Sequence, residues 1–434
     1  MNTDRQLERF TIHVDQDILD DLRARLKATR FAPDLDNNDE VYGLSTKYLK
    51  PLIQYWADGF DWRAAEDQLN SFTHHRINVG GTPVHFIREP GNGPAPIPLL
   101  LMHGWPWTFW DWSKVIRPLT DPAAFGGDRA DAFDVIVPSL PGFGFSTPLT
   151  NGKENYISMA DRFHTLMTDI LGYEKFAVGA GDYGALVGAQ LGHKYAHSLY
   201  GIHLGNEMPT SMFQGDRYWD LTGGRMTTQG ASPEMRADII NFYNTYVSHV
   251  VVHMLDGQTI THGLNDSPAG MLAWILKRWK KWSDQNGVFE DAYPVDHILT
   301  NATIYWVNQA IGTSIRAYRN ANLYPWTPSH HRQPPIEAPA GFTFLLGDAS
   351  PPGAHTPEQR IAIFKAGGGR LYADVRNVNV HHKGGHFGPW ENPDAWIHDL
   401  RATYRDLRYG DARCQGKDST GSSSIAQEFC NDCL

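Results

Sequence analysis

One short segment, residues 175–186, constrains the fold more than any other part of the chain. Its apolar residues 176–178 have the composition of the end of a buried strand, and residues 185–195 suit a packed helix. Between them, Asp182 stands among small residues at 180, 181 and 184, which permit a tight reversal of the backbone. The sequence therefore predicts a strand, a sharp turn and a helix, with a carboxylate presented at the turn.

Asp182 supports two interpretations. A residue at the tip of such a turn is suited to act as a nucleophile, and a carboxylate that attacks an sp3 carbon leaves an ester, which water can cleave. A serine would leave an ether, which water does not readily cleave. Aspartate is also a favoured N-cap, so the side chain could simply cap the helix that follows. The other motifs of the chain have to decide between catalysis and capping.

Composition excludes several classes of function. With 434 residues and 41% hydrophobic content, the chain can bury a large core as one large domain with additions or as two smaller ones. A net charge of -10 argues against a nucleic-acid partner, and no apolar run approaches the roughly 20 residues of a membrane span. The first residues lack the apolar core of a secretory signal. We expect a soluble, cytoplasmic protein.

All three cysteines lie near the C-terminus, and Cys430 and Cys433 form a close pair. A structural zinc site normally needs four ligands, and only Cys414 remains to join that pair. From Cys414 onward the chain is polar and small, which predicts a flexible tail. The cysteines therefore argue against a metal or redox role for this part of the chain.

The pattern of elements predicts an α/β fold in five parts. Strand-like and helix-like segments alternate around the apolar runs 97–102, 134–138 and 176–179, which favours a mostly parallel sheet covered by helices on both faces. A hairpin around Gly80-Gly81 precedes them. The five predicted parts are an N-terminal helical extension (1–75), the first part of the core (76–205), an inserted helical cap (206–332), the second part of the core (333–409) and a tail (410–434).

Helical patterns support the extension and the cap. Residues 15–28 and 62–72 have helical periodicity before the hairpin. In the cap, the composition shifts to Trp, Tyr and His on helical periods from about 206 to 332, and residues 271–279 and 299–318 are two such stretches. Strand patterns resume at 341–346 and 375–380, and a closing helix is expected from 393 to 407.

A second turn, His103-Gly-Trp-Pro106, directly follows an apolar strand. Such a turn can direct a backbone N–H at a reacting oxygen, as an oxyanion hole requires. The donors would be the backbone of Trp105 and of Tyr183, the residue after the nucleophile. The same amides should lower the pKa of Asp182.

A third motif, His382-Lys-Gly-Gly-His386, follows the last predicted strand and presents His386 as the general base. Asp348, after the strand at 343–346, is the natural acid to orient the imidazole. Glu358, in the same long loop, is the alternative acid. The chain order of nucleophile, acid and histidine favours catalysis over capping for Asp182.

Four motifs together resemble the epoxide hydrolases: His103-Gly-Trp-Pro106, Ser139-Leu-Pro-Gly-Phe-Gly-Phe-Ser146, Gly181-Asp182-Tyr-Gly184 and Gly384-Gly-His386-Phe387. The likeness extends to about residue 407 and is greatest to the branch with an N-terminal meander, found in microsomal and fungal enzymes, since residues 266–274 also fit. The resemblance implies an α/β-hydrolase fold in which an aspartate opens an oxirane, a histidine activates water and two cap tyrosines bind the epoxide oxygen. It also implies a possible homodimer and an enzyme that needs neither a metal nor a cofactor.

The cap departs from that pattern. Tyr318 stands where the second tyrosine is expected, but the position of the first holds His249. A neutral imidazole can donate one hydrogen bond, and Tyr246 lies three residues earlier on the same helical face, so either side chain could assist Tyr318. Trp107 replaces a glycine and begins an aromatic cluster that either packs in the core or lines the substrate site. The cluster continues through Phe109, Trp110 and Trp112.

These motifs predict a hydrolase that converts a small-molecule epoxide to a vicinal diol through an aspartyl ester, in detoxification or secondary metabolism. An enzyme that opens the epoxide by cyclisation or isomerisation on the same scaffold is the first alternative. A dehalogenase is a further alternative, disfavoured by Tyr318. A non-catalytic small-molecule binding protein is the last.

Overall fold

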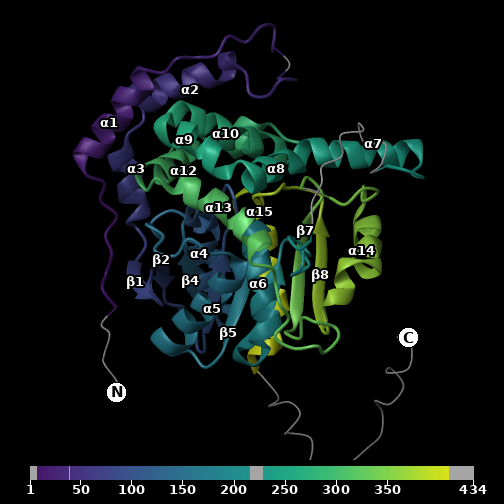
Figure 1. Ribbon diagram of the computed structural model, residues 1–434. Helices are drawn as coiled ribbons and strands as arrows, with labels where there is room; N and C mark the ends of the chain where they lie inside the picture. The colour runs from purple at the N-terminus through teal and green to yellow at the C-terminus, as the bar shows by residue number, and fades with distance from the viewer. Residues whose placement is uncertain (1–6, 39, 216–227, 349, 410–434) are drawn as a thin grey trace, which may run out of the picture.

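The computed structural model describes residues 7–38, 40–215, 228–348 and 350–409. The predicted tail, with its three cysteines, lies outside the described residues, so its flexibility stays a prediction. An eight-stranded sheet forms the centre of the molecule, in the order β1-β2-β4-β3-β5-β6-β7-β8, with helices on both faces (Figure 1). The strands are β1 (His74–Val79), β2 (Thr82–Glu89), β3 (Ile97–Met102), β4 (Phe133–Pro138), β5 (Phe176–Ala180), β6 (Leu199–Leu204), β7 (Ala340–Leu345) and β8 (Val375–His381).

The sheet is parallel from β4 to β8, and β1 and β2 join it antiparallel. This architecture confirms the predicted α/β-hydrolase fold. Strands β3 and β5 are buried along their whole length, as expected for apolar strands covered on both faces. Because the carboxyl ends of parallel strands meet at one edge, the turns after β3, β5, β6, β7 and β8 lie together.

Helices of the core flank the sheet on both sides. Helix α6 directly follows β5 and is almost completely buried. Its Gly184 allows the helix to approach the turn after β3, since a Cβ at this position would lie 2.5 Å from the His103 carbonyl oxygen. The core helices are α4 (Ser113–Thr120), α5 (Tyr156–Thr165), α6 (Asp182–Lys194), α14 (Pro357–Ala366), α15 (Gly388–Glu391) and α16 (Pro393–Arg405).

The N-terminal extension contains three helices, α1 (Gln16–Lys27), α2 (Thr46–Asp58) and α3 (Trp62–Leu69). Helices α1 and α3 confirm the two predicted helical segments. The sequence interpretation missed α2, which contains Pro51 in its interior and so lacks an uninterrupted helical pattern. Figure 1 shows α1 and α2 lying along the outside of the cap. The sheet itself begins at His74, slightly before the predicted boundary at residue 76.

The cap is inserted between β6 and β7 and lies over one edge of the sheet (Figure 1). The helical segment predicted over 299–318 forms two helices, because the backbone of Gln309 adopts a left-handed conformation with φ 48° between them. No helix in the described part of the chain is long and apolar enough to cross a membrane. The cap helices are α7 (Pro233–Phe242), α8 (Ser248–Leu255), α9 (Gly257–Asp266), α10 (Pro268–Trp282), α11 (Phe289–Ala292), α12 (Val295–Val307) and α13 (Ala310–Leu323).

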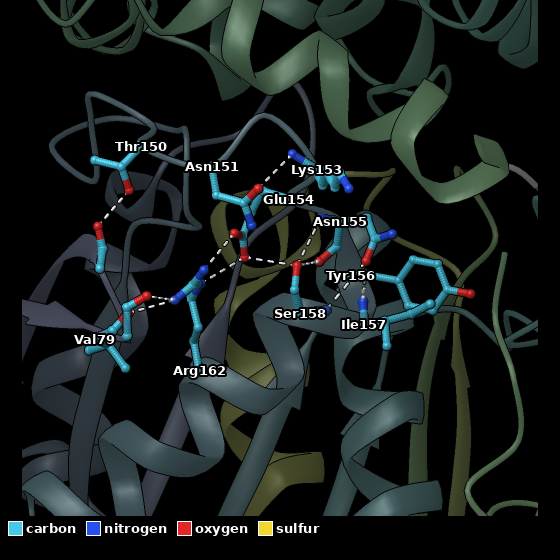
Figure 2. A network of polar contacts seen from close by, with 12 residues as sticks. Val79, Thr150, Asn151, Lys153, Glu154, Asn155, Tyr156, Ile157, Ser158 and Arg162 are labelled. Carbon is cyan, nitrogen blue, oxygen red and sulfur yellow. Dashed lines mark hydrogen bonds and ion pairs between the residues drawn. The ribbon is translucent and has the colours of Figure 1, made fainter. Parts of the chain in front are cut away.

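A network of polar contacts around residues 150–158 joins the core to the cap (Figure 2). Arg162 of α5 forms an ion pair with the buried Glu154 at 2.9 Å and donates to the carbonyl of Val79 in the β1–β2 hairpin. Asn320 of α13 donates to the Glu154 carbonyl at 2.9 Å. The loop therefore fixes helix α13, which carries Tyr318, to the core.

Candidate active site

Asp182 stands at the tip of the turn between β5 and α6, with a φ of 50°. This left-handed conformation is uncommon for a residue other than glycine and is found at strained, functional turns. The N-cap of α6 is Gly181, so Asp182 is the first residue of the helix and not its cap. Its N–H donates to Asn206 Oδ1 at 3.0 Å. Its side chain keeps 14% exposure, so the carboxylate is not sealed within the core.

The turn after β3 directs a backbone amide at this carboxylate. Trp105 N–H donates to Asp182 Oδ1 at 2.7 Å. Gly104 makes this approach possible, because a Cβ there would lie 2.2 Å from the same oxygen. Burial alone would raise the pKa of Asp182, but His386 and the amides of Trp105 and Tyr183 outweigh burial, so the pKa is lower than usual. Asp182 is therefore ionised at neutral pH.

His386 lies between two carboxylates. Its Nδ1 is 2.8 Å from Asp348 Oδ1, and its Nε2 is 3.2 Å from Asp182 Oδ2. The second contact brings opposite charges together without the alignment of a hydrogen bond. Burial opposes protonation of the imidazole, but the charges of Asp348 and Asp182 raise the pKa of His386 to about 10. The imidazole is thus protonated at neutral pH, beside the ionised carboxylate of Asp182.

The structure brings Asp348, and not Glu358, to the imidazole. Asp348 follows β7, and its second oxygen accepts a hydrogen bond from Asn206 Nδ2 at 3.1 Å. Glu358 lies exposed in the first turn of α14. A loop separates Asp348 from the start of α14, so Glu358 does not reach the imidazole.

Two further residues, Asn206 and Glu391, support this arrangement and were missed by the sequence interpretation. Asn206 bridges Asp182 and Asp348 directly after β6. Glu391 accepts the N–H groups of Gly385 and Phe387, on either side of His386, at 3.1 Å each. Burial raises the pKa of Glu391 to about 7. The apolar run 199–204 of β6, left unmarked in the sequence, was the signal that could have located Asn206.

The cap contributes Tyr318 and His249, which contact each other above the nucleophile. The Tyr318 hydroxyl lies 3.3 Å from His249 Nε2, and both side chains are buried. The His249 ring stacks on the indole of Trp105, with centroids 5.1 Å apart and planes 8° apart. Burial raises the pKa of Tyr318 and lowers the pKa of His249, and the charge of Asp182 acts on both groups. Both are therefore neutral at physiological pH.

Tyr246 occupies a different position. Its ring stacks on Trp282 with centroids 5.9 Å apart, and it lines a surface hollow of about 530 Å³ together with Asp348. Burial raises the pKa of Tyr246, and the nearest acidic influence on it comes from Asp348 rather than Asp182. Tyr246 therefore faces the acid side of the site, away from the pair formed by Tyr318 and His249.

The aromatic cluster after the His103 turn mainly packs in the core. Trp107, Phe109 and Trp112 are each at most 1% exposed. Trp107 also touches the site, because its ring lies edge-on to His386 with centroids 5.7 Å apart. The cluster thus packs against the His386 ring through Trp107.

Metal binding finds no support in the described ranges, where no three His, Cys, Asp or Glu side chains are grouped to hold an ion. The expectation that the protein needs neither metal nor cofactor stays a prediction. The groups that meet at the sheet edge can supply a nucleophile, an acid–base pair and hydrogen-bond donors.

Comparisons with known proteins agree with this fold. Residues 7–112 match the family model described as epoxide hydrolase N terminus, and residues 97–249 match that of the alpha/beta hydrolase fold. A juvenile hormone epoxide hydrolase from Bombyx mori has a similar structure, with a TM-score of 0.75 and 26% identity over 94% of this chain and 96% of that one. The Aspergillus niger epoxide hydrolase shares the fold, with a TM-score of 0.73 and 24% identity over 93% of this chain and 97% of that one.

Sequence relatives extend over almost the same length. Epoxide hydrolase 1 of Oryctolagus cuniculus is 28% identical over 92% of this chain and 88% of its own. A putative epoxide hydrolase of Stigmatella aurantiaca is 32% identical over 403 residues, which cover 92% of this chain and 85% of that protein. A relative this similar over nearly the full length, on the same fold, shows that the chain belongs to the epoxide hydrolase family.

Proposed function

We propose that this hydrolase converts an epoxide to a vicinal diol through a covalent ester on Asp182. One observation carries the proposal: the Asp182 carboxylate lies between a backbone amide donor, a histidine held by a second carboxylate, and a neutral tyrosine in the cap. These are the groups that alkylation of a carboxylate, followed by ester hydrolysis, requires.

In the first step, Asp182 attacks an oxirane carbon. Because Trp105 N–H holds Oδ1, the attacking oxygen is Oδ2. The C–O bond of the oxirane breaks, and its electron pair passes to the epoxide oxygen. Tyr318 donates a hydrogen bond to that oxygen and then its proton, and His249, in contact with the same hydroxyl, assists.

In the second step, water cleaves the ester. Alkylation removes the negative charge of Asp182, which is one of the influences that raise the pKa of His386. The imidazole then loses its proton more readily, and Nε2 accepts a proton from water while Asp348 holds Nδ1. The amides of Trp105 and Tyr183 stabilise the tetrahedral oxyanion. The tetrahedral intermediate then collapses, the C–O bond between the Asp182 carboxyl and the substrate breaks, and the leaving diol oxygen takes the proton that Nε2 received from water. The proton that the imidazolium gave up first returns to Tyr318, and the remaining proton of the attacking water passes from the Asp182 carboxyl to His386, which restores the starting state.

Isotope labelling tests the ester. A single turnover in heavy-oxygen water should place label in the carboxylate of Asp182, because water attacks the ester carbonyl. Peptide mass spectrometry after proteolysis measures it. A turnover that leaves Asp182 unlabelled would contradict the covalent intermediate.

A trapping variant gives an independent test. His386→Gln removes the base but not the nucleophile, so the intact protein should gain the mass of one substrate molecule. The matched control is Glu358→Gln, an exposed carboxylate away from the site, which should turn over normally and show no adduct. An adduct that persists when Asp182→Ala is added would place the ester elsewhere.

One second function has a specific observation in its favour. His249 stands where the family pattern has a tyrosine, and its contact with Tyr318 could direct the proton of the opened epoxide differently. The enzyme would then close the opened epoxide onto an internal nucleophile, or isomerise it. Product mass separates the two, since hydrolysis adds one water and isomerisation adds none.

A further inference from the structure

Two buried arginines of the described chain differ sharply in their partners. Arg360 is 5% exposed and forms a two-pronged ion pair with Glu207, with Nη1 2.9 Å from Oε1. Arg278 is 4% exposed and contacts no carboxylate anywhere in the described residues. Removing a cation from water costs several kcal/mol, so buried arginines are normally paired. The unpaired arginine needs an explanation.

The protein compensates Arg278 only in part. The guanidinium lies over the ring of Trp274, with its central carbon 3.8 Å from the centroid, and Nη1 donates to the Trp274 carbonyl at 3.0 Å. Nε and Nη2 have no acceptor within the described ranges. Burial lowers the pKa of Arg278 only to about 10, so the side chain is charged at neutral pH. Most of its charge thus has no counter-ion in the described part of the chain.

Arg278 adjoins the cap side of the active site. Trp274, beneath the guanidinium, donates through Nε1 to His253 Nε2 at 3.2 Å. The His253 ring in turn lies 4.9 Å from the ring of Tyr318 and 4.5 Å from that of Trp105. The cation is therefore two side chains away from the ring of Tyr318, and the side chains between them are Trp274 and His253.

We propose that Arg278 binds a carboxylate of the substrate, several bonds away from the oxirane that Asp182 attacks. A single guanidinium beside neutral groups matches one negative charge and two acceptor oxygens, as a carboxylate provides, better than the double charge of a phosphate monoester. The aromatic side chains between Arg278 and Tyr318 suit an apolar spacer. This proposal rests on the proposed function and names the substrate class of that site.

Turnover of a matched substrate pair tests the preference. The pair is an epoxyoctanoate with a terminal oxirane and its methyl ester, which differ in charge but not in the reacting group. The unaltered enzyme should prefer the acid, and Arg278→Met should lower kcat/KM for the acid by about 10- to 100-fold, mainly through KM, because a hydrogen-bonded charge is lost. The ester should change by less than about threefold.

The matched control is Lys281→Met, which removes an exposed cation from the same helix and should leave the acid-to-ester ratio unchanged. An enzyme that turns over the ester but shows no preference for the acid, or keeps its preference in Arg278→Met, would overturn the carboxylate site alone. Absence of any diol or aspartyl adduct from either substrate would instead contradict the proposed function.

Binding measurements with compounds that lack an oxirane test the carboxylate site independently of the proposed hydrolysis. Calorimetry should detect octanoate binding to the unaltered enzyme, weaker binding of octanamide, and loss of the difference in Arg278→Met. Equal binding of octanoate and octanamide, or of octanoate to both proteins, would contradict the site. The melting temperature of Arg278→Met should not fall, because the substitution removes an unpaired buried charge; a large fall with unchanged octanoate binding would show a purely structural arginine.

Discussion

The two halves of the active site differ in how their titratable side chains are held. On the core side, Asp182 and Asp348 each have an amide donor, and His386 lies between their carboxylates. On the cap side, Nδ1 of His249 and Nδ1 of His253 are buried without a hydrogen-bond partner among the described residues. The core side is preorganised for steps that every substrate undergoes, whereas the cap side keeps ring nitrogens without a partner in the described part of the chain.

The energetic contrast supports this division. Leaving a polar group buried without a partner costs about 1–3 kcal/mol, and an unpaired charge costs more. In the core, the buried carboxylate of Glu154 is paired with Arg162 (Figure 2). The cap accepts the cost at His249, His253 and Arg278, which all lie near Tyr318. We therefore expect core substitutions to affect all substrates alike and cap substitutions to affect them unequally.

The largest effect is expected for the nucleophile. Asp182→Ala should abolish turnover of every epoxide, by about 10⁴-fold or more, since no other carboxylate contacts the Trp105 amide. Steady-state assays of diol formation across several epoxides measure the loss, and circular dichroism checks that the fold is retained. Loss of activity toward only some epoxides would contradict the expectation that core substitutions affect all substrates alike.

The next effect is expected for the proton donor of the cap. Tyr318→Phe should reduce kcat by about 10²- to 10³-fold, because the alkoxide loses a positioned donor. His249→Phe should cost less, about tenfold, since the hydroxyl of Tyr318 remains. Pre-steady-state mass spectrometry should locate both losses in formation of the ester. Slower hydrolysis of the ester, with normal alkylation, would assign these residues to the other half-reaction.

The core half of the site could be predicted from the sequence because its residues stand at the ends of recognisable strands. Apolar runs locate β3, β5 and β7, and the turns that follow carry Trp105, Asp182 and Asp348. Parallel strands bring these turns to one edge, so their proximity follows from topology. Asn206 escaped prediction only because β6 was left unmarked.

The cap half could not be predicted to the same depth. Helix-to-helix packing depends on where each helix breaks, and the left-handed backbone of Gln309 gives no strong sequence signal. Sequence spacing could place Tyr246 and His249 on one helical face but not decide which faces Asp182. Whether Arg278 has a carboxylate partner depends on which side chains surround it, and the spacing of residues in the sequence does not show this.

The third prediction concerns pH and the core side. The pKa of His386 is about 10 in the folded protein and near 6.5 when unfolded. Below pH 6.5 its stabilising charge contacts are fully present, and they are lost as the pH rises toward 10, by at most about 1.4 kcal/mol per pH unit. Denaturant unfolding of the unaltered protein and of His386→Gln at pH 7, 8 and 9 should therefore converge in stability. Parallel curves would show that the imidazole is already neutral in the free enzyme.

The smallest effect is expected for Tyr246, which makes a matched comparison with Tyr318. Both tyrosines are at least mostly buried and both have a raised pKa, but Asp182 acts on Tyr318 and Asp348 acts on Tyr246. Because the Tyr246 ring stacks on Trp282 on the acid side of the site, Tyr246→Phe keeps the packing and removes only the hydroxyl. Formation of the ester should change by less than about threefold, within the range of a group that does not touch the reacting oxygen. A loss as large as that of Tyr318→Phe would mean that the cap closes on the substrate and brings Tyr246 to the epoxide, so that both halves of the site, and not only the core, are rebuilt during turnover.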